Sequence, residues 1–80
     1  MYTVYALRSD KDGRIYVGFT ENIGRRLKEH NSRNVFSTKG FCPWRVLHTK
    51  TVATRKDARV REKYLKSGTG KEFLRSIVPG

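Results

Sequence analysis

The sequence predicts an α+β fold in which a small three-stranded antiparallel sheet is flanked by helices, in the order β-β-α-β-α-α. Two features support this prediction. Side chains alternate in 2–7, and composition typical of strands returns in 14–19 and 45–52. After Thr20, and again after Thr54, the apolar spacing changes to that of helices. Strands followed by helices in one short chain are typical of an α+β domain.

The first two strands are expected to form a hairpin. Residues 9–13 (Ser-Asp-Lys-Asp-Gly) are turn formers with a glycine available for positive φ, and they separate 2–7 from 14–19. The third strand is expected over 45–52, after Pro43 and Trp44.

The first helix is expected over 22–30, with Asn22 as its N-cap and Ile23 and Leu27 on one face. Residues 31–40, with Val35 and Phe36 as isolated apolar positions, read as a loop.

The second helix is expected to begin at Thr54, with Asp57 in its first turn, and to end near Ser67 before Gly68. A capping box over 69–72 predicts a short final helix, whose apolar face consists of Phe73, Leu74 and Ile77.

Composition narrows the class of protein. The 80 residues fit a single domain spanning 1–80, and 36% hydrophobic residues argue against a disordered basic tail. One cysteine, Cys42, excludes an internal disulfide framework and a cysteine-based zinc site. We expect neither a signal peptide nor a membrane span, and therefore a cytoplasmic location.

The charge indicates a polyanionic partner. Lys and Arg number 18 against 7 acidic residues, for a net charge of +11. These cations are spread from Arg8 to Arg75 among aromatic residues instead of gathering on one amphipathic helix. That distribution favours nucleic acid over a membrane surface.

Two candidate groups lie on the first predicted helix. Arg26 and His30 are four residues apart and share a face, with Arg26 at the margin of the apolar stripe, where a guanidinium can grip a phosphate. The alternative is a surface Arg–His pair without a role. Arg25 and Lys28 read as an ordinary solvated face.

A third candidate is Glu62 on the second helix. It lies four residues after Ala58 and three before Leu65, within the stripe that these two define. It is either a metal ligand or a helix residue ion-paired with Arg61 or Lys63. A single carboxylate holds Mg²⁺ when waters and substrate phosphates complete the coordination.

Tyr5 and Tyr16 lie on the two strands of the hairpin, and they share a face only if the register allows it. The alternative is that both are packing aromatics. Neither Cys42 nor His48 has partners at a spacing that predicts catalysis or metal binding.

Together these segments resemble the GIY-YIG nuclease superfamily, in particular its small stand-alone members related to the catalytic domain of the bacterial excision-repair nuclease subunit. The matching segments are Thr3-Val4-Tyr5, Tyr16-Val17-Gly18, the helix of Arg26 and His30, residues 37–40 with Pro43-Trp44, and the helix of Glu62.

The resemblance implies a metal-dependent endonuclease of DNA repair, acting on DNA more readily than RNA. Its site would comprise Tyr5, Tyr16, Arg26, His30 and Glu62, with Mg²⁺ or Mn²⁺ on Glu62. Tyr5, hydrogen bonded with His30, would activate the water and Tyr16 would orient the water or the phosphate, with the two roles exchangeable. Arg26 would stabilise the transition state, and the metal would assist the leaving group. A site crowded with Arg, Lys and metal charge would favour the phenolate and lower the pKa of that tyrosine. Because one domain leaves no separate targeting module, we expect either weak sequence selectivity or delivery by a protein partner.

The chain departs from the family pattern in three places. Thr3-Val4 replaces Gly-Ile, Phe19 stands where some members have a polar group, and no asparagine follows Asn34. These departures keep two alternatives open: a nucleic-acid-binding module with little or no turnover, and a basic RNA-binding or ribosome-associated protein.

Overall fold

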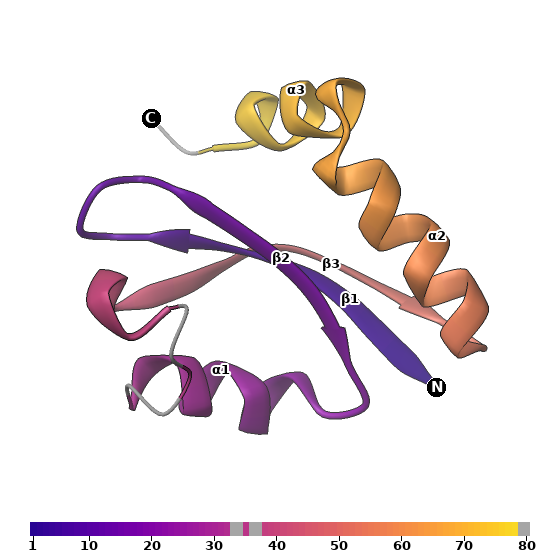
Figure 1. Ribbon diagram of the computed structural model, residues 1–80, viewed down its shortest axis with the longest axis horizontal. Coiled ribbons are helices and arrows are strands. Elements are labelled where there is room, and N and C mark those ends of the chain that lie inside the picture. Colours follow the sequence, from indigo (N-terminus) through magenta and orange to yellow (C-terminus); the bar gives the residue numbers. More distant parts are fainter. Residues whose placement is uncertain (33–34, 36–37, 79–80) are drawn as a thin grey trace.

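Strand β1 (Tyr2–Ser9) is the centre of a three-stranded antiparallel sheet, between β2 (Ile15–Thr20) and β3 (Trp44–Val52). The remaining elements are α1 (Ile23–Asn31), the 3₁₀ turn η1 (Lys39–Phe41), α2 (Arg55–Lys66) and α3 (Gly68–Ser76). This computed structural model (Figure 1) describes residues 1–32, 35 and 38–78. The predicted α+β class and element order are confirmed.

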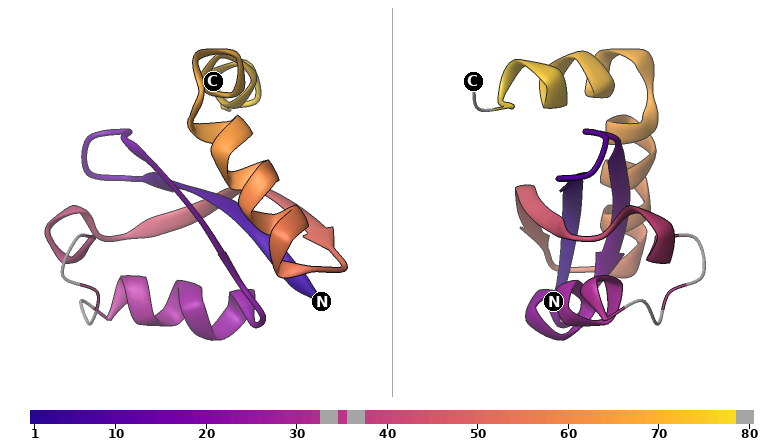
Figure 2. Two further views of the ribbon diagram at one scale, coloured as in Figure 1. Left: turned by 45° about the vertical axis from the view of Figure 1, so that its right-hand side comes forward. Right: turned by 90° about the vertical axis from the view of Figure 1, so that its left-hand side faces the viewer.

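The central strand is buried on both faces because helices cover both sides of the sheet. Val4 and Ala6 pack with α2 and α3, whereas Tyr5 and Leu7 pack toward α1. Both views in Figure 2 keep α1 on one side of the sheet and α3 on the other. Successive β1 side chains therefore enter two separate cores, as the alternation along a strand requires.

The register of the hairpin decides which residues share a face. Tyr5 lies opposite Gly18, and Leu7 lies opposite Tyr16. Because paired positions project to the same face, Tyr5 and Tyr16 both point to the α1 side. The register that the sequence left open thus brings the two tyrosines together.

Two of the predicted helix caps are confirmed. The Asn22 side chain accepts a hydrogen bond from the Arg25 N–H, and the Thr54 side chain accepts one from the Asp57 N–H. Each cap satisfies an N–H group that the first helical turn would otherwise leave without a partner.

The predicted start of the last helix is wrong. Ser67 ends α2 and caps α3, accepting a hydrogen bond from the Gly70 N–H, so the helix begins at Gly68 instead of at a capping box over 69–72. The two helices therefore meet without a linker. Gly70 is buried at this corner, where the absence of a side chain lets α3 pack against the last turn of α2.

The expected loop over 31–40 is described only in part. Asn31 completes α1 and residues 39–41 form η1, whereas Phe36 and Ser37 lie outside the described residues, as do 33 and 34. Within the part of the chain that the structure describes, no helix combines the length and apolar character needed to cross a bilayer.

Substituting Gly70 tests the α2–α3 corner. A Cβ at this position would overlap the Tyr64 carbonyl oxygen and lie 2.6 Å from the Leu65 Cα. We expect Gly70→Ala to lower the free energy of unfolding by about 3 kcal/mol, measured by denaturant titration.

Gly68→Ala is the matched control, since a Cβ there meets nothing within 4 Å. It should be neutral or stabilising by about 0.5 kcal/mol. Equal destabilisation by both substitutions would contradict the packing described for this corner.

Candidate active site

A buried chain of hydrogen bonds joins the sheet to α1. The Tyr5 hydroxyl lies 3.1 Å from His30 Nε2, and His30 Nδ1 lies 2.8 Å from Thr38 Oγ1. Tyr5, His30 and Thr38 are each at most 1% exposed. Three polar side chains are therefore removed from water, and their hydrogen bonds to one another satisfy them.

The two ends of this chain fix the direction of its protons. At one end, Arg26 lies beside Tyr5, and burial together with the Arg26 charge lowers the pKa of His30, so the ring is neutral at pH 7 and only one of its nitrogens carries a proton. At the other end, Thr38 Oγ1 lies 3.4 Å from the Val35 carbonyl, which can only accept. Tyr5 therefore donates to His30 Nε2, and His30 donates from Nδ1 to Thr38. The imidazole is neutral, with its proton on Nδ1.

Burial, rather than the nearby positive charge, has the largest effect on the pKa of the Tyr5 phenol. Desolvation raises the pKa of Tyr5 above 10.0, and the hydrogen bond from Arg26 offsets this only in part. The chain's own cations therefore do not lower the pKa of Tyr5 below its ordinary value, whereas the expectation also counted the charge of a bound metal. The physical reason is that the ring lies inside the core, where the charged form loses its hydration.

Gly18 makes room for the Tyr5 ring. A Cβ on Gly18 would lie 2.8 Å from the Tyr5 hydroxyl oxygen and 3.0 Å from the ring carbon that carries it. Any larger residue would push the phenol off His30. The glycine of the Tyr16-Val17-Gly18 segment thus has a steric role across the strand pair.

Arg26 and Tyr16 are the groups of this cluster that reach the surface. The Arg26 side chain is 35% exposed, and its guanidinium lies 3.7 Å from the Glu29 carboxylate. Tyr16, on the edge strand, is half-buried, and its ring centroid lies 5.0 Å from that of His30 and 6.4 Å from that of Tyr5.

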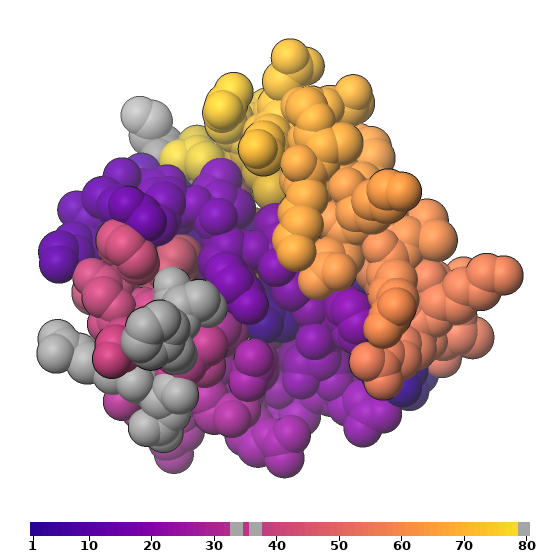
Figure 3. Space-filling view, in the orientation of Figure 1, coloured from indigo at the N-terminus to yellow at the C-terminus, as the bar shows by residue number. Residues whose placement is uncertain are grey.

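Glu62 approaches the cluster from α2. Its carboxylate is among the charges that act on the Tyr5 phenol, together with Tyr16 and Arg26. It pairs with Lys66 at 3.6 Å, one helical turn on, instead of with Arg61 or Lys63. Figure 3 shows a hollow between β2, α1 and α2, with the indigo of β1 visible at its floor.

The donor set at Glu62 is sparse but suits a hard cation. Within residues 1–32, 35 and 38–78, no three His, Cys, Asp or Glu side chains gather to hold a metal ion. The Glu62 side chain is 25% exposed, so one carboxylate is open to the surface. Magnesium in phosphoryl-transfer sites is held in this way, with waters and substrate phosphates as further ligands.

Two contributors were missed by sequence reasoning. Thr38 orients His30, but it lies in a polar stretch with no periodicity. Asn31 pairs with the Trp44 backbone, accepting from its N–H at 2.6 Å and donating to its carbonyl at 3.1 Å. The Trp44 indole N–H donates to the Thr38 carbonyl at 3.0 Å. Only the folded chain brings these segments together.

The comparison with protein families agrees with this geometry. The model of the GIY-YIG catalytic domain matches residues 1–75. The chain belongs to the GIY-YIG family. Its GIY-YIG motifs therefore correspond to the strands that carry Tyr5 and Tyr16, and the predicted resemblance is confirmed.

Relatives of this GIY-YIG chain fall into two groups. The UPF0213 protein CPE1444 of Clostridium perfringens is 32% identical over 96% of this chain and 83% of its own length. The human structure-specific endonuclease subunit SLX1 is 37% identical over 59% of this chain, but that match spans 18% of the human protein. The solution structure of the UPF0213 protein BH0048 of Bacillus halodurans has a TM-score of 0.57 and 33% identity, covering 100% of this chain and 88% of its own.

The buried histidine should make stability depend on pH. Burial, then the Arg26 charge, holds the pKa of His30 below 6.5, and burial with Arg61 does the same for His48. Below about pH 6.5 the unfolded chain binds protons that the folded chain does not. The free energy of unfolding should therefore decrease as the pH is lowered, by up to ~1.4 kcal/mol per pH unit for each histidine.

Denaturant titrations between pH 7 and pH 5 measure this slope. His30→Gln should flatten it, and His48→Gln is the matched single-histidine variant. An unchanged slope in His30→Gln would show that His30 is not held neutral.

Proposed function

We propose that the protein is a divalent-metal-dependent endonuclease that hydrolyses phosphodiester bonds, with DNA as its substrate. The observation that supports this most strongly is a convergence: Tyr16 from β2, Arg26 from α1 and Glu62 from α2 all lie near enough to act electrostatically on the buried Tyr5 phenol. A base, a fixed cation and a carboxylate are the groups that in-line attack on a phosphate requires.

Arg26 stabilises the transition state in this proposal. It lies beside Tyr5 and pairs with Glu29 at 3.7 Å, and its side chain stays 35% exposed. A planar guanidinium can then donate two hydrogen bonds to the equatorial oxygens of phosphorus as negative charge grows there. Tyr5 and His30 act through Arg26 as positioning residues.

Tyr16 is the tyrosine proposed to activate the attacking water. Tyr5 is 1% exposed, and its hydroxyl is hydrogen bonded to His30 inside the core, so the attacking water cannot reach it. Tyr16 lies at the edge of the sheet and is half-buried. It takes the proton of the water while the water oxygen attacks phosphorus and the 3′ oxygen departs.

Glu62 is the residue proposed to hold the metal, Mg²⁺ or Mn²⁺. When bound, the ion supplies positive charge to the departing oxygen. Lys66 lies 3.6 Å from Glu62.

A catalytically weak nucleic-acid-binding module is the second candidate. The single carboxylate at the site and the absence of an asparagine after Asn34 favour it. A separate targeting partner and a cytoplasmic location remain part of the proposal for either function.

Cleavage of labelled single- and double-stranded DNA and RNA, with Mg²⁺, Mn²⁺ or EDTA, tests the proposal. We expect metal-dependent products with DNA. Arg26→Ala, Glu62→Ala and Tyr16→Phe should each lower the rate by ~100-fold or more. Glu62→Ala should still bind DNA, because an acid has been removed from a basic surface.

Lys28→Ala, on the solvated face of α1, is the control and should cleave as the wild type does. Tight binding without cleavage of any substrate would favour the binding module and return Glu62 to the role of a helix ion pair.

A further inference from the structure

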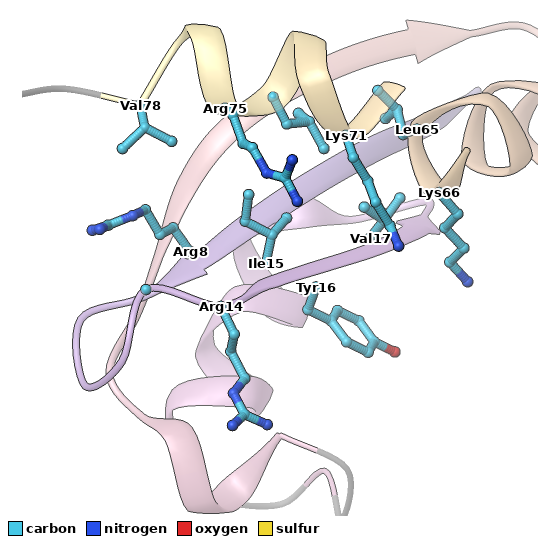
Figure 4. A pocket seen from close by; sticks show the side chains of 12 residues that line it. Arg8, Arg14, Ile15, Tyr16, Val17, Leu65, Lys66, Lys71, Arg75 and Val78 are labelled. Atoms are coloured by element: carbon cyan, nitrogen blue, oxygen red, sulfur yellow. The ribbon is translucent and has the colours of Figure 1, made fainter. Parts of the chain in front are cut away.

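A second concave surface lies beside the candidate active site. It is a groove between the β1–β2 hairpin and the corner where α2 meets α3, with a volume of about 760 Å³. Figure 4 shows helical side chains on one side of it and hairpin side chains on the other. None of its residues is needed for the chemistry proposed above except Tyr16, which lies at its edge.

The groove combines an apolar floor with a cationic rim. Its floor is formed by Ile15, Val17, Leu65 and Leu74, with Val78 at one end. Its rim carries Arg8, Arg14, Lys66, Lys71 and Arg75. No acidic residue is among the side chains that line it in the described part of the chain.

Three of the rim cations are available to a ligand. Arg14 is held by Asp12 at 2.7 Å, and Lys66 is held by Glu62. Among residues 1–32, 35 and 38–78, no carboxylate lies within ion-pairing distance of Arg8, Lys71 or Arg75. Concentrated, unneutralised positive charge along a groove is typical of a site for phosphates.

The groove is continuous with the candidate active site. Tyr16 borders both, and Lys66 on the groove rim lies one helical turn beyond Glu62. A chain of phosphates leaving the site along the edge of β2 would therefore pass Lys66 and then the α3 cations.

We propose that this groove binds a single-stranded nucleic-acid segment that flanks the phosphate at the candidate active site. Phosphates contact Lys71 and Arg75 on α3 and Arg8 on β1, and bases cover the apolar floor. A duplex would present only its backbone here and leave the floor without a partner, whereas a single strand offers both phosphates and bases. That the bound segment flanks a reacting phosphate rests on the proposed function, whereas binding in the groove does not.

Measuring binding in the absence of metal separates the role of the groove from that of catalysis. The probe is a fluorescein-labelled oligothymidylate of about 12 nucleotides, followed by anisotropy in EDTA. The Lys71→Ala/Arg75→Ala variant removes two groove cations. The Lys50→Ala/Arg59→Ala variant removes two exposed cations that do not line the groove and is the matched control.

The groove variant should bind about 25-fold more weakly near 0.1 M salt, and its salt dependence should lose about 1.4 units of log–log slope, at ~0.7 for each lost phosphate contact. In the wild type, oligothymidylate should shift the methyl resonances of Ile15, Leu74 and Val78.

Equal losses of affinity in the two double variants, or unmoved methyl resonances, would contradict the proposal that the groove is the binding site. If duplex DNA binds as tightly as oligothymidylate and depends equally on Lys71 and Arg75, the proposal that the groove selects a single strand is contradicted. Groove-dependent binding without any cleavage would support the groove while the proposed nuclease failed. Cleavage by the groove variant with wild-type KM would contradict the groove proposal while supporting the proposed nuclease activity.

Discussion

The hydrogen bond between the Tyr5 hydroxyl and His30 Nε2 is the constraint on which the site depends. It crosses from the central strand to α1, and through it the sheet fixes where that helix lies. Arg26 lies beside the phenol, and on the other side the imidazole Nδ1 is hydrogen bonded to Thr38. Because this chain is buried, an interruption at any link leaves a polar group without water or a partner, at a cost of roughly 1–3 kcal/mol.

That buried chain divides the cluster into two sets of residues. Tyr5 and His30 are sealed inside and set geometry, whereas Tyr16, Arg26 and Glu62 are open to solvent and come from three different elements. The groove that begins at Tyr16 extends the same surface toward α3. The large positive charge is therefore organised: part of it surrounds the hollow, and part lines a path leading away from it.

Local signals predicted most of the fold, because strand alternation, turn residues and the caps Asn22 and Thr54 act within a few positions of one another. The start of α3 could not be predicted in this way, since Ser67 competes with Thr69 and the outcome depends on Gly70 packing against α2. Tyr5 and Tyr16 required the strand register before they could be placed on one face.

The motif residues of the candidate site were predicted from the sequence. The interactions that hold those residues in place were not predicted. Thr38 and the Asn31–Trp44 pair leave no periodic trace, because their partners come from other parts of the chain. The raised pKa of Tyr5 has the same origin. Charge can be counted in a sequence, whereas the burial that outweighs it exists only after the sheet and α1 have packed.

Nitrogen-15 NMR of the His30 imidazole at pH 7 tests the central claim most directly. The hydrogen-bonded chain from Tyr5 to Val35 predicts a neutral ring with its proton on Nδ1 and an unprotonated Nε2 that accepts from Tyr5, and Tyr5→Phe should change the Nε2 resonance. A ring protonated on Nε2, or on both nitrogens, would contradict the account.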